Sequence, residues 1–327
     1  MNHSTSDSPS RRILAVHPGA LGDVVLFGHL LRAIDGAVTL VARGEKAHLL
    51  VGLGACDRAM DFDALPIHEL MSDTPIGDRA LPGLLGTHDR VVSCFGGNGP
   101  RLATMCGATD AAVLPVRPPP HARGHLLDLW ADLLGPTPIP AEHPWPVPRD
   151  WRRQAGEALA AAHVAPDRAY VVLHPGAGSR DKCWPAEKFA TLARHMPHSI
   201  RPAVVLGPVE RERGPSREAF AGLPVLDQPS LSTLAGVLSG AHGYVGNDSG
   251  VSHLAAAVGT PTVVLFGPTR AEQFAPRGRC VRTITSPGMS LSVLDDAAVA
   301  ATLLATVRLR DKLCRNLLDV SMMGRYI

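Results

Sequence analysis

The segment from Val245 to Thr269 restricts the fold of this chain more than any other stretch. It passes from an apolar strand candidate through Gly-Asn-Asp-Ser-Gly to a short apolar helix candidate, and then through Gly259 into the apolar run Thr262–Phe266. Continuous apolar runs are typical of buried strands, and glycine often ends a helix. The segment therefore predicts a β-α-β unit with both strands in a parallel sheet.

The first turn of this unit has the composition of an anion site. Asp248 and Ser249 are good N-cap residues, and we expect Gly246 and Gly250 to let the backbone turn sharply beside uncovered helix amides. Such amides and the positive end of the helix dipole attract anions. A simpler alternative is that Asp248 only caps the helix.

Composition excludes several classes of protein. The 327 residues suggest about two domains, and a formal net charge of +2 indicates no nucleic-acid-binding surface. The six cysteines lack C-x-x-C pairs and zinc-like spacing with histidine, which indicates a reducing cytoplasm and no structural zinc. No apolar run reaches the roughly 18 residues that span a bilayer, so membrane contact would be peripheral. Polar residues 1–10 are predicted to be disordered.

The N-terminal half predicts a second α/β sheet. The apolar run Ile13–Val16 ends in His-Pro-Gly-Ala-Leu-Gly-Asp (residues 17–23), and apolar residues at helical spacing follow. Strands are expected over 38–42 and 90–94, whereas residues 61–88 predict no clear element. Asp61-Phe62-Asp63 matches the D-x-D of metal-dependent sugar transferases, although such a triplet arises easily at a strand end.

A proline-rich segment separates the two halves. Six prolines lie between Gly135 and Pro148, and proline-rich segments act as semi-rigid spacers outside sheets. We therefore predict an N-terminal lobe over 1–148 and a C-terminal lobe over 149–327.

The C-terminal half begins as the N-terminal half does. The strand Tyr170–Leu173 ends in His-Pro-Gly-Ala (residues 174–177), the tetrapeptide that also follows the first strand of the chain. Because ligands of open α/β sheets bind outside the carboxyl ends of the strands, both copies are expected to line a shared cleft. Lys182, just before a helix that starts at Pro185, is expected to point into that cleft. The last helix is expected over 293–309.

Three motifs, in this order, resemble glycosyltransferase family 9, the heptosyltransferase-like enzymes of lipopolysaccharide assembly. They are Gly19–Val24, then His174–Ala177 through Pro185, then Gly246–Gly250 with His253 and Gly267-Pro268-Thr269. The resemblance implies α/β GT-B architecture, with the acceptor on the N-terminal Rossmann-like lobe and the nucleotide-sugar donor on the C-terminal one. It implies metal-independent, inverting transfer of a sugar, usually heptose from an ADP-linked donor, to a glycan or glycolipid. It further implies no cofactor, and a cytoplasmic enzyme that touches the inner membrane face peripherally at most.

The resemblance also implies roles for single residues. Inverting displacement needs a carboxylate to take the acceptor proton and positive charge on the departing diphosphate. Asp23 matches the family's base, and Lys182 matches its diphosphate-binding lysine. The donor-binding residues that the resemblance implies are Ala20, Leu21, Gly22, Ser179, Lys182, Trp184, Glu210, Asp248, Ser249, Gly250 and His253.

Structural alternatives accompany several of these roles. Asp23 could stabilise the dipole of its own helix, Lys182 could be a solvated surface residue, and His253 could be a packed or capping histidine. Trp184 is expected to wedge the start of its helix rather than stack on a base, and Glu212 competes with Glu210 for the ribose. His17 and His174 are expected to shape their loops, with contact to the cleft as the alternative, and Cys183 stands where the family often has a basic residue.

Two other functions are alternatives for this sequence. A dinucleotide-dependent oxidoreductase is disfavoured because no complete G-x-G-x-x-G follows the first strand and Arg43, not an acid, closes the second. A non-catalytic GT-B-like protein would keep the donor loop and would need no base at Asp23.

Overall fold

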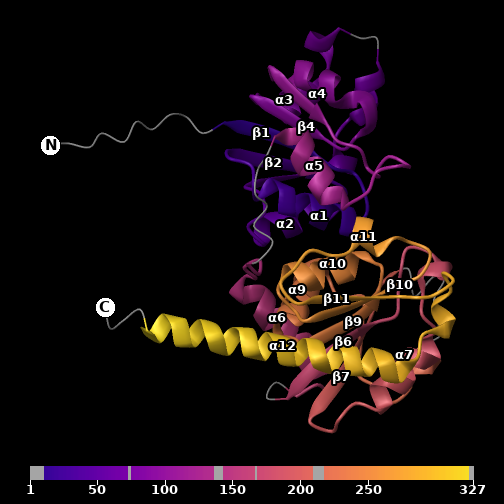
Figure 1. Cartoon of the computed structure of the whole chain (residues 1–327). Helices are drawn as coiled ribbons and strands as arrows, with labels where there is room; N and C mark the ends of the chain where they lie inside the picture. The colour runs from indigo at the N-terminus through magenta and orange to yellow at the C-terminus, as the bar shows by residue number, and fades with distance from the viewer. Residues whose placement is uncertain (1–10, 73–74, 136–142, 166–167, 209–216, 324–327) are drawn as a thin grey trace. The chain divides into compact units, whose positions relative to one another are not determined.

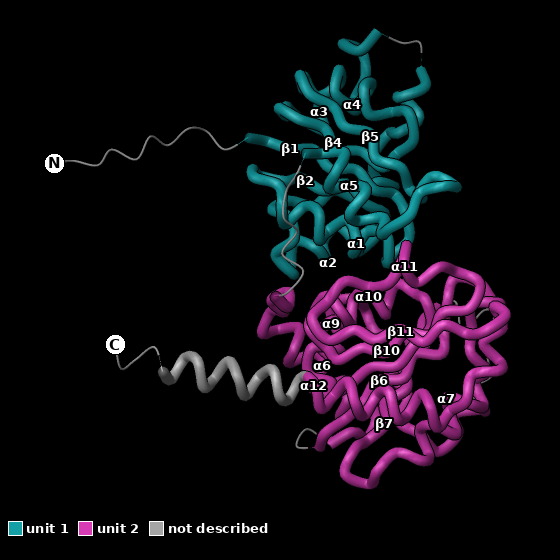
Figure 2. Tube along the Cα trace, in the orientation of Figure 1, with its two compact units in different colours: residues 1–140 teal, residues 141–327 magenta. Residues whose placement is uncertain are grey.

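The chain forms two compact units in the computed structural model, which describes residues 11–72, 75–135, 143–165, 168–208 and 217–323. Unit 1 comprises residues 1–140 and unit 2 residues 141–327 (Figure 2). The division falls inside the proline-rich segment 135–148, slightly before the predicted boundary at 148. The prediction for residues 1–10 lies outside the described residues.

Unit 1, drawn in indigo and magenta in Figure 1, is a parallel five-stranded sheet. Its strand order is β3-β2-β1-β4-β5. The strands are β1 (Arg12–Val16), β2 (Ala37–Ala42), β3 (Arg58–Asp61), β4 (Arg90–Ser93) and β5 (Asp110–Val113). The helices are α1 (Leu21–Leu31), α2 (Lys46–Gly52), α3 (Ala80–Leu85), α4 (Gly99–Cys106) and α5 (Leu126–Leu134). On one face, Leu14 and Val16 of β1 pack against Leu81 of α3 and Leu102 of α4. On the other, α1 packs against α2 and α5.

Unit 2 is a parallel six-stranded sheet with the order β11-β10-β9-β6-β7-β8. The strands are β6 (Ala169–His174), β7 (Ile200–Leu206), β8 (Val225–Asp227), β9 (Gly243–Asn247), β10 (Thr262–Phe266) and β11 (Val281–Thr285). The helices are α6 (Arg149–Ala161), α7 (Ala186–Arg194), α9 (Leu231–Gly240), α10 (Gly250–Ala257), α11 (Ala271–Phe274) and α12 (Asp296–Met323). Both units thus confirm the predicted parallel α/β class.

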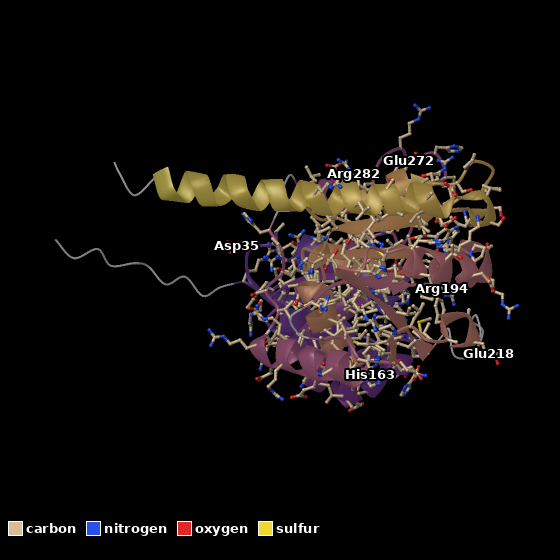
Figure 3. The ribbon with its side chains drawn as sticks, turned by 90° about the horizontal axis from the view of Figure 1, so that it is seen from below. Asp35, His163, Arg194, Glu218, Glu272 and Arg282 are labelled. Atoms are coloured by element: carbon tan, nitrogen blue, oxygen red, sulfur yellow. The ribbon has the colours of Figure 1, made fainter. Side chains whose placement is uncertain are left out.

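Helices cover both faces of the unit 2 sheet. Helix α6 packs against α9, and the contact is so close that a Cβ atom on Gly236 would lie 2.3 Å from the carbonyl oxygen of Trp151. Helices α7 and α12 pack on the other face around Phe189 and Leu303. Charged residues such as Arg194, Glu272 and Arg282 are exposed at the surface of this unit (Figure 3).

Most predicted elements are present, and the differences concern short or exposed segments. Residues 61–88, which predicted no clear element, contain three short 3-10 helices and α3. The final helix begins at Asp296 rather than 293 and continues to Met323, well beyond the predicted end at 309.

Candidate functional site

The Gly-Asn-Asp-Ser-Gly turn lies at the carboxyl end of β9, in the middle of the unit 2 sheet. Strand β9 pairs with β6 on one side, with His174 opposite Gly246, and with β10 on the other. The loop after β6, which carries Lys182, and the loop after β10, which carries Thr269, therefore start beside this turn. Three loops that are distant in sequence converge there, as expected for a ligand site of a parallel sheet.

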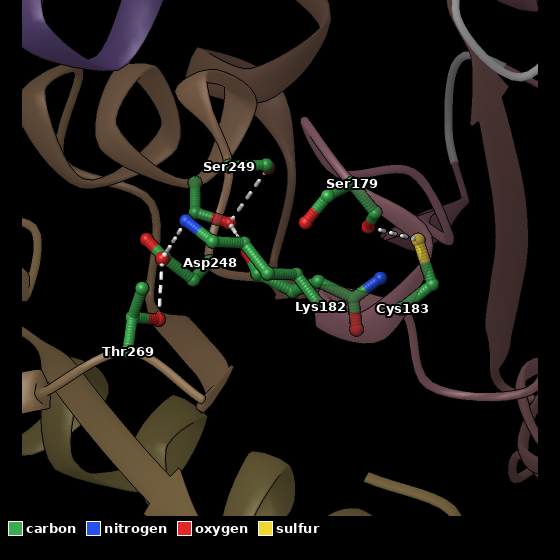
Figure 4. A network of polar contacts seen from close by, with 8 residues as sticks. Ser179, Lys182, Cys183, Asp248, Ser249 and Thr269 are labelled. Atoms are coloured by element: carbon green, nitrogen blue, oxygen red, sulfur yellow. Dashed lines mark hydrogen bonds and ion pairs between the residues drawn. The ribbon is translucent and has the colours of Figure 1, made fainter. Parts of the chain in front are cut away.

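Asp248 connects these three loops through its carboxylate (Figure 4). Its Oδ2 atom lies 2.9 Å from Nζ of Lys182 and accepts a hydrogen bond from Oγ1 of Thr269 at 2.7 Å. The side chains of Asp248 and Lys182 are 10% and 29% exposed, so the pair is largely shielded but still accessible from one side. Asp248 therefore joins three loops and is not the N-cap of α10, and Lys182 is not a free surface lysine.

Asn247 braces the turn from below. Its side chain is fully buried, its Oδ1 accepts a hydrogen bond from the backbone N–H of Trp184 at 3.0 Å, and its Nδ2 donates to the carbonyl of Pro175 at 2.7 Å. Its own carbonyl accepts from the hydroxyl of Ser252. Asn247 thereby fixes both ends of the loop that holds Lys182 relative to β9.

Helix α10 presents its N-terminus to the same place. It starts at Gly250 with Ser249 as N-cap, and Ser249 makes no capping hydrogen bond; its hydroxyl instead lies 3.4 Å from Nδ1 of the buried His174. The amides of Gly250 and Val251 donate no hydrogen bond to any described residue. Orphan amides at a helix N-terminus beside a lysine form a site suited to an oxyanion.

The expected role of the two glycines in turning the chain is wrong. Neither Gly246 nor Gly250 adopts a positive φ. Gly246 belongs to β9, where a Cβ atom would lie 2.1 Å from the hydroxyl oxygen of Tyr244. The absence of a side chain at Gly246 therefore makes room for Tyr244, which hydrogen-bonds Ser252 at 2.9 Å.

Ser179, Cys183 and Trp184 shape the loop around Lys182. Ser179 precedes the 3-10 turn Arg180–Lys182, and its carbonyl lies 3.4 Å from Sγ of Cys183 (Figure 4). A hydrogen bond from the side chain of Ser179 lowers the pKa of Asp181. Trp184 is 1% exposed and packs edge-on against Phe189, which agrees with a wedge at the helix start rather than a base-stacking surface.

Two further residues, His253 and Glu210, were predicted to bind the donor, and both roles stay predictions. His253 is buried at 8% exposure within α10. Glu210 and its alternative Glu212 lie outside the described residues.

Asp23 lies in the first turn of α1, in unit 1. Ala20 is the N-cap, Leu21 and Gly22 start the helix, and Asp23 is half-buried. The preceding loop is held by His17, whose Nδ1 accepts a hydrogen bond from the backbone N–H of Gly19 at 3.1 Å. His17 is 1% exposed, and burial lowers its pKa to about 4, so its ring is neutral at pH 7.

His17 is also packed into an aromatic cluster. Its ring centroid lies 5.3 Å from that of Phe27 in α1 and 6.0 Å from that of Trp130 in α5. This packing agrees with the expected loop-shaping role. The structure describes the two units separately, so the prediction of a shared cleft stays a prediction.

The Asp61-Phe62-Asp63 triplet forms a turn. Oδ1 of Asp61 accepts hydrogen bonds from the backbone N–H groups of Asp63 and Gly44, which lower the pKa of Asp61. Oδ1 of Asp63 lies 3.7 Å from Nε of Arg43. These contacts account for both carboxylates, and no group of three metal-ligating side chains occurs among the residues that the structure describes.

Asn247 and Thr269 were not assigned a role from the sequence. Asn247 is part of the Gly246–Gly250 motif, and Thr269 is part of Gly267-Pro268-Thr269. Asparagine after a strand and threonine after Gly-Pro are, however, common in turns. A usable signal is that Asn247 ends a buried strand and that Thr269 lies in the loop just after another one.

Comparison with known proteins assigns the chain to a family. Residues 122–291, just over half of the chain, match the model of Glycosyltransferase family 9 (heptosyltransferase). Lipopolysaccharide heptosyltransferase 1 of Escherichia coli O18:K1:H7 (strain RS218 / NMEC) is 36% identical over 133 residues, which are 40% of this chain and 41% of that protein. The match thus spans about two fifths of this curated relative.

Solved structures of similar fold cover nearly the whole chain. The glycosyl transferase family 9 protein of Veillonella parvula DSM 2008 has a TM-score of 0.74 at 18% identity and covers 91% of this chain and 97% of its own. E. coli heptosyltransferase WaaC with ADP has a TM-score of 0.64 at 22% identity and covers 90% and 99%. The fold class is therefore GT-B, as predicted. Within the described residues, no helix is long and apolar enough to cross a membrane.

Proposed function

Because this chain belongs to glycosyltransferase family 9, we propose that it is an inverting, metal-independent glycosyltransferase. It would transfer a sugar, with heptose as the first candidate, from an ADP-linked donor to a hydroxyl group of a glycan or glycolipid. Support for the sugar comes from the heptosyltransferase relative, and support for the nucleotide from the solved structure that holds ADP.

The observation that carries this proposal is the Lys182–Asp248–Thr269 group beside the N-terminus of α10. An ammonium group has three N–H donors, and Lys182 uses one of them on Asp248 among the described residues. Two donors remain for the oxygens of a diphosphate. The amides of Gly250 and Val251 would bind the same group.

Within the proposed donor site, Asp248 would set the direction of Lys182. A carboxylate would repel a diphosphate, but its pairing with Lys182 and Thr269 offsets that charge. The lysine then enters the reaction already oriented, which reduces the entropy lost when the leaving group develops charge. Asp23 would take the proton from the acceptor hydroxyl as that oxygen attacks the anomeric carbon, and the nucleoside diphosphate would leave from the opposite side.

The test is a donor assay combined with a nucleotide panel. Full-length protein would be incubated with ADP-heptose and a lipopolysaccharide-core acceptor, and release of ADP would be measured in excess EDTA. Thermal shifts would be compared for ADP, UDP, GDP and CMP. We expect transfer without metal and the largest shift with ADP. Binding of ADP without transfer would support a non-catalytic nucleotide-sugar-binding protein, whereas a larger shift with UDP or GDP would overturn the ADP-linked donor.

A further inference from the structure

A cavity of about 610 Å³ lies in unit 1, at the amino ends of strands β1, β2 and β3. Its wall includes Arg12, Thr39, Arg58, Met60, Leu84 and His88. Asp23 follows the carboxyl end of β1, so the cavity and Asp23 lie at opposite ends of the strands of this sheet. The volume is within the range of about 300–1,000 Å³ that is usual for small-molecule sites.

The strand register places Arg12 and Arg58 on the face of the unit 1 sheet that elsewhere packs in the apolar core. Leu14 of β1 pairs with Thr39 of β2, and Thr39 pairs with Arg58 of β3, so the three side chains share a face. Arg12 shares it too, because it lies two residues before Leu14 on the same strand. Leu14 belongs to the apolar core, whereas the two arginines leave the end of this face open and positively charged.

The charges in the cavity do not cancel. Arg12 donates from Nη1 to the hydroxyl of Thr87 at 2.8 Å, and its Nη2 lies 3.6 Å from Asp89. The side chain of Arg58 makes no hydrogen bond or ion pair with any residue that the structure describes. Asp89 therefore offsets Arg12, and Arg58 supplies surplus positive charge.

His88 adds a buried polar atom to the same wall. It is 8% exposed, and its Nδ1 atom has no hydrogen-bond partner among the described residues. Burial, followed by the charge of Arg12, lowers the pKa of its ring, while a backbone hydrogen bond at Gly86 and the charge of Asp89 act in the opposite direction. A buried nitrogen without a partner is costly unless a ligand or water supplies one.

We propose that this cavity binds a small organic oxyanion, a phosphate monoester or a carboxylate that carries a short apolar group. The guanidinium group of Arg58 would bind the oxyanion, assisted by Arg12, because the guanidinium fork matches both kinds of anion. His88 lies in the same wall, so a bound anion would change the surroundings of its ring. Met60 and the half-exposed Leu84 would contact the apolar group. The inference does not depend on the proposed transferase activity.

The probes are n-hexyl phosphate, hexanoate and n-hexanol, titrated into the full chain by calorimetry and by NMR of ¹³C-labelled histidine. We expect saturable binding of at least one anion with a Kd of about 1 mM or tighter, and a shift of the His88 signal. Hexanol should bind at least about tenfold more weakly, since it lacks the charge that Arg58 recognises. The stronger of the two anions identifies the preferred oxyanion.

Three variants locate the site. R58Q should weaken binding by about tenfold or more, whereas R282Q, which removes an exposed arginine of unit 2, should not change it. Lys182→Ala should also leave it unchanged, which separates this cavity from the proposed donor site. Equal binding by R58Q and the wild type, loss of binding in Lys182→Ala, or no saturable binding of either anion up to about 10 mM would overturn the proposal.

Discussion

Nζ of Lys182 lies 2.9 Å from Oδ2 of Asp248, 66 positions later in the chain. The pair joins the loop after β6 to the turn after β9, and Thr269 holds the same carboxylate oxygen from the loop after β10. Because the side chain of Lys182 is still 29% exposed, the pair's own contribution to stability is modest. Its main consequence is a lysine held in one direction beside the first amides of α10.

Replacing Lys182 with alanine should weaken the binding of ADP more than that of adenosine. The variant removes the contact to the diphosphate and leaves the rest of the nucleotide site intact. ADP at about 100 times its Kd should stabilise the wild type by about 2.7 kcal/mol, and this gain should fall in the variant. Turnover should decrease by about 10² to 10³ if the contact strengthens in the transition state.

Thermal shifts with ADP and with adenosine measure this difference, and Arg282→Ala is a matched control because it removes an exposed cation from β11 of the same unit (Figure 3). The control should behave as the wild type. If Lys182→Ala binds ADP and turns over normally, Lys182 does not bind the diphosphate.

Replacing Asn247 with alanine should destabilise unit 2 by about 2–4 kcal/mol. The change leaves the buried N–H of Trp184 and the carbonyl of Pro175 without their partner, and each such loss costs about 1–3 kcal/mol. Urea unfolding followed by tryptophan fluorescence measures the loss. Asn98→Ala in unit 1, which removes a longer, half-buried bond to Phe95, should cost at most about 1 kcal/mol. A similar small loss for Asn247→Ala would show that Asn247 is not the brace of this loop.

The central strands were predictable from sequence, whereas the edge strands β3, β5 and β8 were not. β6, β9 and β10 lie inside their sheet and are almost entirely buried, so they read as continuous apolar runs. β3, β5 and β8 lie at sheet edges, have three or four residues, and are mostly exposed or half-buried. Short edge strands carry little of the apolar pattern on which sequence reasoning depends.

The site was predictable as a set of residues but not as a network. The sequence placed Lys182 and Asp248 near one anion site, yet their contact depends on β6 and β9 being neighbours, which the chain order does not state. The contacts of Asn247 and Thr269 could not be predicted for the same reason. Gly246 was misinterpreted because a glycine near a turn and a glycine that admits a tyrosine look alike in sequence.

His17 should make unit 1 less stable in mild acid. Its pKa is lowered from 6.5 to about 4 in the folded state, chiefly by burial, so the unfolded chain binds more protons between these values. Stability from this group is therefore fully present above about pH 6.5 and is lost as the pH falls towards 4, with a total of about 3 kcal/mol.

The measurement compares urea unfolding of the wild type and His17→Gln at several pH values between about 4 and 7. Glutamine can still accept the hydrogen bond from Gly19, but it does not titrate. Its curve should be flatter with pH than that of the wild type, and fluorescence of Trp130, which packs on His17, reports on unit 1. Parallel pH profiles for both proteins would mean that His17 titrates normally in the folded state.

Replacing Asp23 with asparagine should lower turnover by about 10² to 10⁴ and leave ADP binding nearly unchanged, because a general base acts on the acceptor and not on the nucleotide. Assays in excess EDTA exclude rescue by a bound cation. Asp35→Asn, which removes an exposed carboxylate just after α1, serves as the control and should keep full activity. The simpler alternative is that Asp23 only stabilises the positive end of α1, which is worth about 0.3–1 kcal/mol. In that case the variant would show a slightly lower melting temperature with normal turnover, and the role of general base would have to be assigned elsewhere.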